Sequence, residues 1–253
     1  KNGVLTQKDF DRYNIIERKP VCGIFQKHKV CSMGEPSSGA LTMLQILKLI
    51  DHNPTWHNYI EASKLAFADR NYYMADPDFV KTPGKHLISD KYILKRRRLI
   101  SSENIINDAQ HGTPASWKEN TQASYYGPNE SGTTHISIID QYGNAISMTS
   151  TIENAFGSRI MANGYLLNNE LTDFSFSPKK NNNLVANRVQ AGKRPRSSMT
   201  PTIVFSTSTN KPTLIIGSAG GSRIIGYVTQ RIIDVLYNNM SLEDAINAPH
   251  ILN

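Results

Sequence analysis

The spacing of apolar residues is helical in the first part of the chain and strand-like after Gly132. From residue 41 to 67, apolar side chains recur every three or four positions, as they do on one face of an α-helix. This spacing predicts helices over about residues 41–50 and 56–67. The segment 70–84 contains two prolines and is expected to interrupt the helices, which resume briefly within residues 89–106.

After Gly132, apolar and polar residues alternate, which is typical of strands. A helix is expected from about Ser222 to Asn238, and another begins at Ser241, where Asp244 completes an N-capping pattern. Helices, then mainly antiparallel strands, then helices again predict a layered α/β sandwich of the α+β kind. The predicted strands cover residues 134–140, 144–152, 164–169, 201–206 and 212–217.

The first 40 residues predict a helical turn, a hairpin and a loop of small residues, "EPSSGA". A two-residue hairpin loop at Gln26 and Lys27 places Cys22 opposite Cys31. Either a cross-strand disulfide or a free buried pair fits this pattern. Two cysteines exclude a disulfide scaffold and a zinc ribbon.

Composition narrows the classes of function. The chain has 253 residues, of which 39% are hydrophobic and 19% charged, as in a globular protein. The net charge is +7, and the cluster from Lys95 to Arg98 is interpreted as a solvated helix face, because no nucleic-acid-binding signature accompanies it. No apolar run reaches the length of a membrane span, and the polar opening contains no signal peptide. The polar opening and the stop after "NAPHILN" suggest a fragment.

The segment from His111 to Glu130 is polar and aperiodic and is expected to be an exposed loop. It leads to Gly132 and a strand that begins with Thr133. A turn at Gln141–Gly143 closes the following hairpin, and counting outward from it places Thr133 opposite Thr151. Glu153, two residues further, is expected on the same side.

A threonine placed in this way suits a nucleophile that is created by chain cleavage. Breaking the bond between Gly132 and Thr133 frees the α-amine of Thr133, whose unperturbed pKa of about 8 lets it act as a general base. Such a site needs no catalytic histidine, metal or cofactor. The competing interpretation is an ordinary cross-strand pair of threonines.

The chain strongly resembles the γ-glutamyltransferases, or glutathione hydrolases, of the N-terminal-nucleophile hydrolase superfamily. Matching blocks span nearly all of it in the family's order: "RKPVCGIFQKHKVCSMGEPSSG", "ADRNYYMADPDFV", "TTHISIIDQYGNAISMTSTIENAFGS", "YLLNNELTDFS", "GKRPRSSMTPTIVF" and "GSAGGSRI". The resemblance implies a four-layer αββα sandwich, incomplete in this chain. It also implies self-cleavage between Gly132 and Thr133, so that residues 1–132 are the last part of a large subunit and 133–253 the first part of a small catalytic subunit.

The resemblance further implies roles for single residues. Thr133 is the expected nucleophile and Thr151 its hydrogen-bond partner. Gly220 and Gly221 are expected to form an oxyanion hole, which suits glycine because its backbone N–H can approach a ligand closely. The residues expected to bind the substrate are Glu153, Glu170 and Asp173 for its α-amino group, and Ser197 and Ser198 for its α-carboxylate.

Three features depart from the family pattern. Many members have Asn and Gln in place of Glu153 and Glu170, so this site is more acidic. The family's carboxylate-binding arginine lies upstream of this chain. The stretch between Asp173 and Arg194 is shorter than in members with a long lid, which implies an open pocket.

The expected activity is transfer or hydrolysis of the γ-glutamyl group of glutathione and related amides, with an amino acid, a peptide or water as acceptor. The alternatives are a glutaryl or cephalosporin-type acylase and a catalytically incomplete interaction fragment. By resemblance, the location is periplasmic or extracellular. No nucleic-acid partner is expected.

Overall fold

The computed structural model describes residues 4–115, 117 and 132–252. Its helices are α1 (Gln7–Asp11), α2 (Gly39–Ile50), α3 (Trp56–Tyr73), α4 (Asp90–Arg97), α5 (Ile224–Leu236) and α6 (Leu242–Asn247), with short 3₁₀ turns at η1 (Gly84–Ile88), η2 (Glu170–Asp173) and η3 (Gly221–Arg223). Its strands are β1 (Val21–Phe25), β2 (His28–Ser32), β3 (Thr134–Ile139), β4 (Ala145–Ser150), β5 (Met161–Ala162), β6 (Tyr165–Leu166), β7 (Lys179–Lys180), β8 (Asn183–Leu184), β9 (Thr202–Ser206) and β10 (Pro212–Ile216).

The central sheet has the order β1-β2-β9-β10, and all its neighbouring strands are antiparallel. Its middle pair joins segments far apart in the sequence, because β2 pairs with β9 from His28 opposite Ser206 to Ser32 opposite Thr202. The sheet is therefore built from both sides of Gly132.

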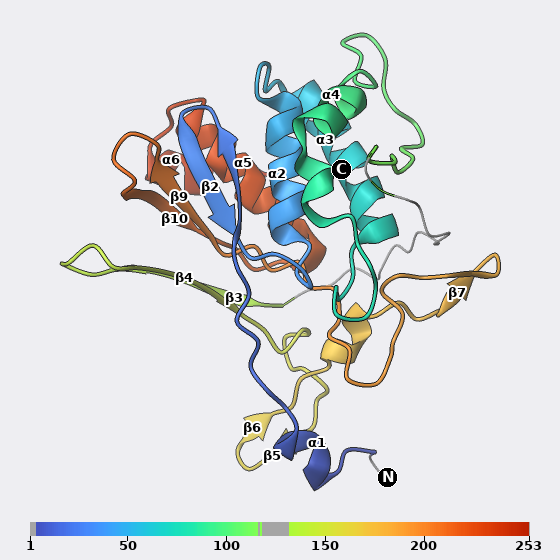
Figure 1. Cartoon of the computed structure of the whole chain (residues 1–253). Coiled ribbons are helices and arrows are strands. Elements are labelled where there is room, and N and C mark those ends of the chain that lie inside the picture. The colour runs from blue at the N-terminus through green and yellow to red at the C-terminus, as the bar shows by residue number, and fades with distance from the viewer. Residues whose placement is uncertain (1–3, 116, 118–131, 253) are drawn as a thin grey trace.

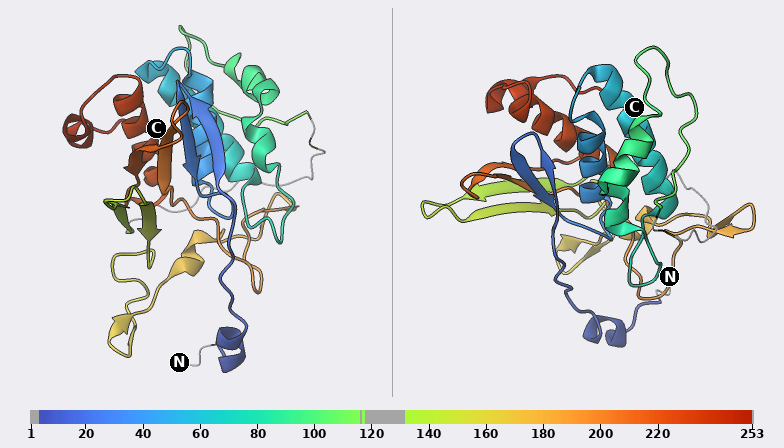
Figure 2. Two further views of the ribbon diagram at one scale, coloured as in Figure 1. Left: turned by 60° about the vertical axis from the view of Figure 1, so that its left-hand side comes forward. Right: turned by 45° about the horizontal axis from the view of Figure 1, so that its top comes forward.

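Three layers follow one another in the molecule (Figures 1 and 2). One face of the sheet contributes Val30, Val204 and Leu214 to a core shared with α2, α3 and α5. The β3–β4 hairpin lies beneath β9 and β10, where the hydroxyls of Ser137 and Ser147 donate to the carbonyls of Ile215 and Ile216 at 3.3 and 3.1 Å. These are an α, a β and a second β layer of the expected αββα sandwich. The described residues form no second helical layer.

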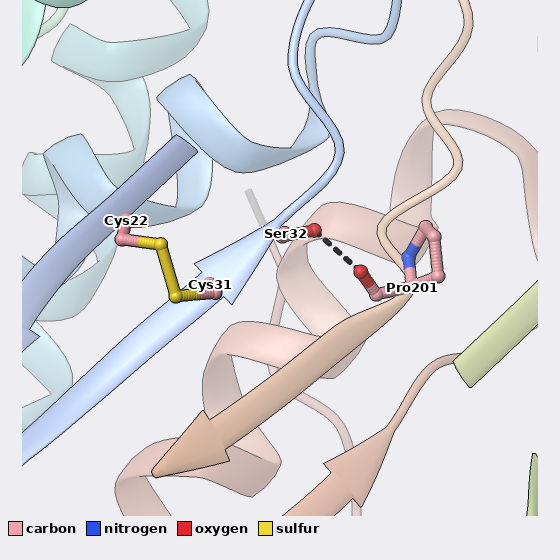
Figure 3. The surroundings of a disulfide bond; sticks show 4 residues. All are labelled: Cys22, Cys31, Ser32 and Pro201. Carbon is pink, nitrogen blue, oxygen red and sulfur yellow. Dashed lines mark hydrogen bonds between the residues drawn. A yellow bond between two sulfur atoms is a disulfide. The ribbon is translucent and has the colours of Figure 1, made fainter. Parts of the chain in front are cut away.

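A disulfide joins Cys22 to Cys31, which settles the two alternatives that the sequence left open (Figure 3). The two residues are paired directly across β1 and β2, as the two-residue loop predicts. The next residue, Ser32, donates its hydroxyl to the carbonyl of Pro201 at 2.8 Å, so the bridged hairpin is tied to the start of β9.

Several boundaries differ from the sequence prediction, and of the strand expected over residues 164–169 only Tyr165–Leu166 is a strand. Helix α3 continues to Tyr73, because tertiary packing buries Tyr72 and Tyr73, and Pro77 lies beyond its end. The expected exposed loop is anchored where it begins: the backbone N–H of Gly112 donates to Asp69, and its carbonyl accepts from Tyr73, both at 2.8 Å. Most of the remainder of that loop lies outside the described residues.

The interpretation of the basic cluster as a solvated face is wrong for two of its four residues. Arg96 is 3% exposed, forms an ion pair with Asp69 at 3.3 Å and donates to the carbonyl of Leu65. Arg97 donates to the carbonyl of Leu49 at 2.9 Å, near the end of α2. These guanidinium groups satisfy a buried carboxylate and backbone carbonyls, so half of the cluster's charge stabilises the fold.

No helix in the described part of the chain is long and apolar enough to cross a bilayer.

Candidate active site

The hairpin register predicted from the turn at residues 141–143 is confirmed. Gly143 has a φ of +86°, and the N–H of Asp140 donates to the carbonyl of Asn144 at 3.0 Å. Thr134 pairs with Ser150, so the next pair outward is Thr133 with Thr151. The hydroxyl of Thr133 donates to that of Thr151 at 3.2 Å.

The backbone at Gly132 and Thr133 has positive φ angles, which glycine adopts readily and threonine does not. Gly132 has a φ of +148°, and a Cβ there would lie 1.8 Å from the carbonyl oxygen of Glu153, so only glycine fits. Thr133 has a φ of +91°, which is an outlier for a β-branched residue. Such conformations cost about 1–3 kcal/mol each and persist where the surrounding structure imposes them. The expected scissile bond therefore joins a position that only glycine can occupy to a threonine in an unfavourable conformation.

Gly220 and Gly221 lie between β10 and α5, beside this junction. The N–H of Gly220 donates to the carbonyl oxygen of Gly132 at 3.1 Å. Its φ is +124°, and a Cβ there would come within 2.8 Å of the Tyr227 ring. The structure thus aims a backbone donor at the carbonyl whose oxygen would gain negative charge during cleavage.

A small cavity of about 20 Å³ collects most of the other expected site residues. Glu170 does not line it: this residue begins the 3₁₀ turn η2 and is half-buried. The residues that do are Thr133, Thr151, Glu153, Asp173, Ser197, Ser198, Met199, Gly221 and Ile224. The structure therefore brings the nucleophile candidate together with two of the three acids and both serines.

A larger cavity, of about 580 Å³, lies elsewhere, between β10, the outer part of the hairpin, α5 and α6. None of the expected site residues lines it. His135 does, and its ring nitrogens are 2.8 Å from the Thr149 hydroxyl and 3.0 Å from the Ser137 hydroxyl. Burial lowers the pKa of His135. The imidazole thus contacts two hydroxyls of its own hairpin, and neither of them is that of Thr133.

Glu153 reaches the cavity through a turn rather than by strand alternation, because β4 ends at Ser150 and Glu153 has a φ of +71°. Its N–H donates to the Thr151 hydroxyl at 2.9 Å, and its carboxylate accepts from the Asn169 amide. Asn169 also accepts from the N–H of Asn154 at 2.9 Å and thereby fixes this turn. Sequence reasoning missed Asn169, although it lies in the matching block "YLLNNELTDFS".

The serine pair is held by the loop of small residues that precedes α2. The N–H and the hydroxyl of Ser38 both donate to the carbonyl of Ser197 at 2.8 Å. The N–H of Ser197 donates in turn to the carbonyl of Pro36 at 3.2 Å. Behind this loop, Arg70 of α3 donates to the Ser198 hydroxyl at 2.6 Å, a contact that sequence reasoning also missed. Within the described ranges, no group of histidines, cysteines and acids is arranged to hold a metal ion.

Comparison with known proteins agrees with the motifs. The family model described as Gamma-glutamyltranspeptidase matches residues 1–253. The chain belongs to this family. A glutathione hydrolase proenzyme of Bacillus subtilis (strain 168) is 38% identical over 267 residues, which cover 98% of this chain and 44% of that protein. A glutathione hydrolase proenzyme of Escherichia coli (strain K12) is also 38% identical, over 265 residues that cover 98% of this chain and 44% of that protein.

Acylases are related as well. An acylase ACY 1 proenzyme of Pseudomonas sp. (strain V22) is 30% identical over 261 residues, covering 98% of this chain and 43% of that protein. The crystal structure of cephalosporin acylase from Bacillus halodurans matches with a TM-score of 0.81 and 23% identity, over 98% of this chain and 43% of its own. This likeness confirms the predicted fold class. The chain spans less than half the length of these curated relatives.

Proposed function

We propose that this chain is part of a self-cleaving enzyme that transfers or hydrolyses the γ-glutamyl group of glutathione and related amides. The observation that carries the proposal is the arrangement around one peptide bond. The Thr133 hydroxyl is 3.2 Å from that of Thr151, and the N–H of Gly220 is 3.1 Å from the carbonyl oxygen of Gly132.

Maturation begins with attack of the Thr133 hydroxyl oxygen on the carbonyl carbon of Gly132. The oxygen of that carbonyl becomes an oxyanion, which the N–H of Gly220 stabilises. The proton of the hydroxyl passes to the nitrogen of Thr133 as the C–N bond breaks, which leaves an ester between the two residues. Water hydrolyses this ester and frees the carboxylate of Gly132 and the α-amine and hydroxyl of Thr133. Residues 1–132 then end the large subunit and residues 133–253 begin the small one.

In the catalytic cycle, the new α-amine takes the proton of the Thr133 hydroxyl as the oxygen attacks the γ-carbonyl of the donor. Glu153 and Asp173 face the donor's ammonium, and Ser197 and Ser198 its α-carboxylate. The departing amine takes up the proton, and water or an amino acid then releases the acyl group. Glu170, which the resemblance assigns to the same ammonium group, does not line the cavity and has no direct contact with the donor in the proposed cycle.

The direct test uses the full-length precursor and its Thr133→Ala variant. The wild type is expected to separate into two subunits on a denaturing gel, with Thr133 at the new amino terminus, and to hydrolyse a γ-glutamyl anilide. Thr133→Ala is expected to remain one chain without activity. Equal cleavage of both proteins would rule out Thr133 as the nucleophile.

The second candidate is an acylase for glutaryl or cephalosporin-type amides, which the similarity to an acylase proenzyme favours. The acids that line the cavity discriminate between the two. A glutaryl donor lacks the ammonium group and would desolvate Glu153 and Asp173 without supplying a cation, which costs about 1–3 kcal/mol or more. We expect catalytic efficiency on a γ-glutamyl anilide to exceed that on the glutaryl anilide by at least ~10-fold.

Asp173→Ala is expected to reduce turnover of the γ-glutamyl anilide far more than that of the glutaryl anilide. Equal turnover of the two anilides by the wild type would favour the acylase.

The proposed location is periplasmic or extracellular. The Cys22–Cys31 disulfide supports this location, since disulfides persist in oxidising compartments.

A further inference from the structure

Arg70, near the end of α3, is a buried cation directly behind the candidate site. It is 4% exposed. Its guanidinium donates to the hydroxyls of Ser38 at 2.8 Å and Ser198 at 2.6 Å, and to the side-chain oxygen of Asn71 at 3.1 Å. A buried charge is costly unless it is hydrogen-bonded, and here two of these bonds go to the loops that form the serine pair.

The contact with Ser198 determines the direction in which the serine can donate. A guanidinium only donates hydrogen bonds, so the Ser198 oxygen must be the acceptor in this contact. The proton of the Ser198 hydroxyl therefore remains available for a different partner. Ser198 lines the cavity that also contains Thr133 and Asp173, which is where a substrate carboxylate could accept this proton.

Through its contact with Ser38, Arg70 also helps to hold the backbone of Ser197. The Ser38 hydroxyl accepts from the Nε of Arg70 and donates its own proton to the carbonyl of Ser197 at 2.8 Å. One planar group thus fixes the hydroxyl of one serine and the backbone of the other. The forked donors of arginine can do this at once, whereas the single ammonium of lysine cannot reproduce the geometry.

We propose that Arg70 is a positioning residue for the anionic end of the substrate. It orients the Ser198 hydroxyl to donate to the donor's α-carboxylate. This assignment rests on the proposed function, because it concerns the carboxylate of a γ-glutamyl donor. It goes beyond that function in assigning recognition of this carboxylate to a residue of α3 that does not itself touch the substrate.

The test compares two donors that differ only in the carboxylate. One is a γ-glutamyl anilide, and the other is the 4-aminobutyryl anilide, which keeps the ammonium group and the reacting amide. Both are measured with the full-length mature enzyme, at enzyme concentrations high enough to detect slow turnover. The variants are Arg70→Gln and Arg70→Lys. The matched control is Arg97→Gln, because Arg97 is also a hydrogen-bonded arginine, with the carbonyl of Leu49 as acceptor, but belongs to α4 and contacts neither serine.

Arg70→Gln is expected to lower kcat/KM for the γ-glutamyl anilide by about 10- to 100-fold, mainly through KM, in line with the loss of hydrogen bonds to a charged group. Its effect on the 4-aminobutyryl anilide is expected to stay within about threefold. The kcat/KM of Arg70→Lys for the γ-glutamyl anilide should lie between those of Arg70→Gln and the wild type. Arg97→Gln should leave the ratio of the kcat/KM values for the two donors unchanged. In a Ser198→Ala background, Arg70→Gln should add little further loss, because both substitutions interrupt the same contact.

Equal losses on both donors would show that Arg70 only supports the fold and would overturn the assignment, as would an Arg70→Gln enzyme with wild-type KM. If Arg70→Gln fails to fold, Arg70→Lys decides by the same ratio. A wild-type enzyme that turns over the glutaryl anilide and neither of these donors would instead overturn the proposed function, and this assignment with it.

Discussion

Residues with positive φ meet at the bond that we expect to be cut. Gly132 leaves no room for a side chain, because its Cβ would lie 1.8 Å from the carbonyl oxygen of Glu153. Gly132→Ala must therefore shift the backbone and draw the carbonyl away from the N–H of Gly220. We expect self-cleavage of the precursor to slow by at least ~10-fold, equivalent to about 1.4 kcal/mol in the barrier. Subunit formation over time, followed by intact mass, measures this rate.

Gly143→Ala is the matched control. Gly143 also has a positive φ, +86°, but nothing lies within 4 Å of a Cβ placed there. The Gly143→Ala variant therefore places an alanine at an unfavourable φ in the same hairpin without contacting Gly132 or Thr133. If both variants cleave equally fast, the close approach to Glu153 is not what requires glycine at residue 132.

Glu35 makes the stability of the fold depend on pH. Burial raises the pKa of its carboxyl from 4.5 to about 7, although the Thr82 hydroxyl donates to it at 2.8 Å. Because the folded state binds this proton more tightly than the unfolded state, the contribution is favourable below about pH 4.5 and is lost as pH rises through 7. Glu35→Gln should therefore raise the free energy of unfolding by about 2–3 kcal/mol at pH 8 and little at pH 4.

Urea unfolding at the two pH values measures this difference. Glu17→Gln serves as the control, because it removes an exposed acid that lines the same surface cavity, of about 370 Å³, as Glu35. A Glu35→Gln variant whose advantage is the same at pH 4 and pH 8 would contradict the prediction.

Single residues also show which contacts could be predicted from the sequence and which could not. The Thr133–Thr151 pair follows from counting along one hairpin, because a short turn fixes its register. The contact of Arg70 with Ser198 spans 128 positions, and no periodicity encodes such a contact. Glu170 was expected in the cavity by motif alone, and the 3₁₀ turn η2 places it outside the cavity's lining.

At the scale of elements, the β1–β2 hairpin is bridged across its strands and tied by Ser32 to the start of β9. The bridge closes a short loop, with the cysteines 9 positions apart, for which chain entropy predicts about 2–3 kcal/mol of stabilisation. Replacing both Cys22 and Cys31 by Ser should lower the midpoint of thermal unfolding. It should also abolish the sensitivity of that midpoint to a thiol reductant, whereas the wild type should lose stability on reduction. An unchanged midpoint in both comparisons would show that the bridge contributes nothing measurable.

The elements themselves were largely predictable, because α2, α5 and the strands of the central sheet carry strong periodic patterns. The exact ends of these elements, and which of their charged residues are buried, were not predictable. Helix α3 runs beyond the predicted end because tertiary packing buries Tyr72 and Tyr73, and Arg96 is buried because Asp69 needs a counter-charge. In both cases the deciding partner lies on another element.

At the scale of the whole molecule, the central sheet combines strands from the two sides of the expected cut. Strand β2 pairs with β9 over five residues, and Ser38 holds Ser197 by two further bonds. We expect the two pieces of the mature protein to co-elute in gel filtration under native conditions and to separate only in denaturant. Thr133→Ala, which stays uncut, provides the reference elution volume. Separate elution of the pieces in native buffer would contradict the prediction.

The shared sheet also implies that folding precedes the proposed cleavage. The strands must find one another while they still belong to one chain, when β2 and β9 meet by an intramolecular search at a high effective concentration. Once the bond is cut, the same sheet can be rebuilt after denaturation only by a collision between two molecules. If the bond is cut as we propose, the precursor can recover from unfolding by itself, while the two cleaved pieces recover together at a rate that falls with dilution.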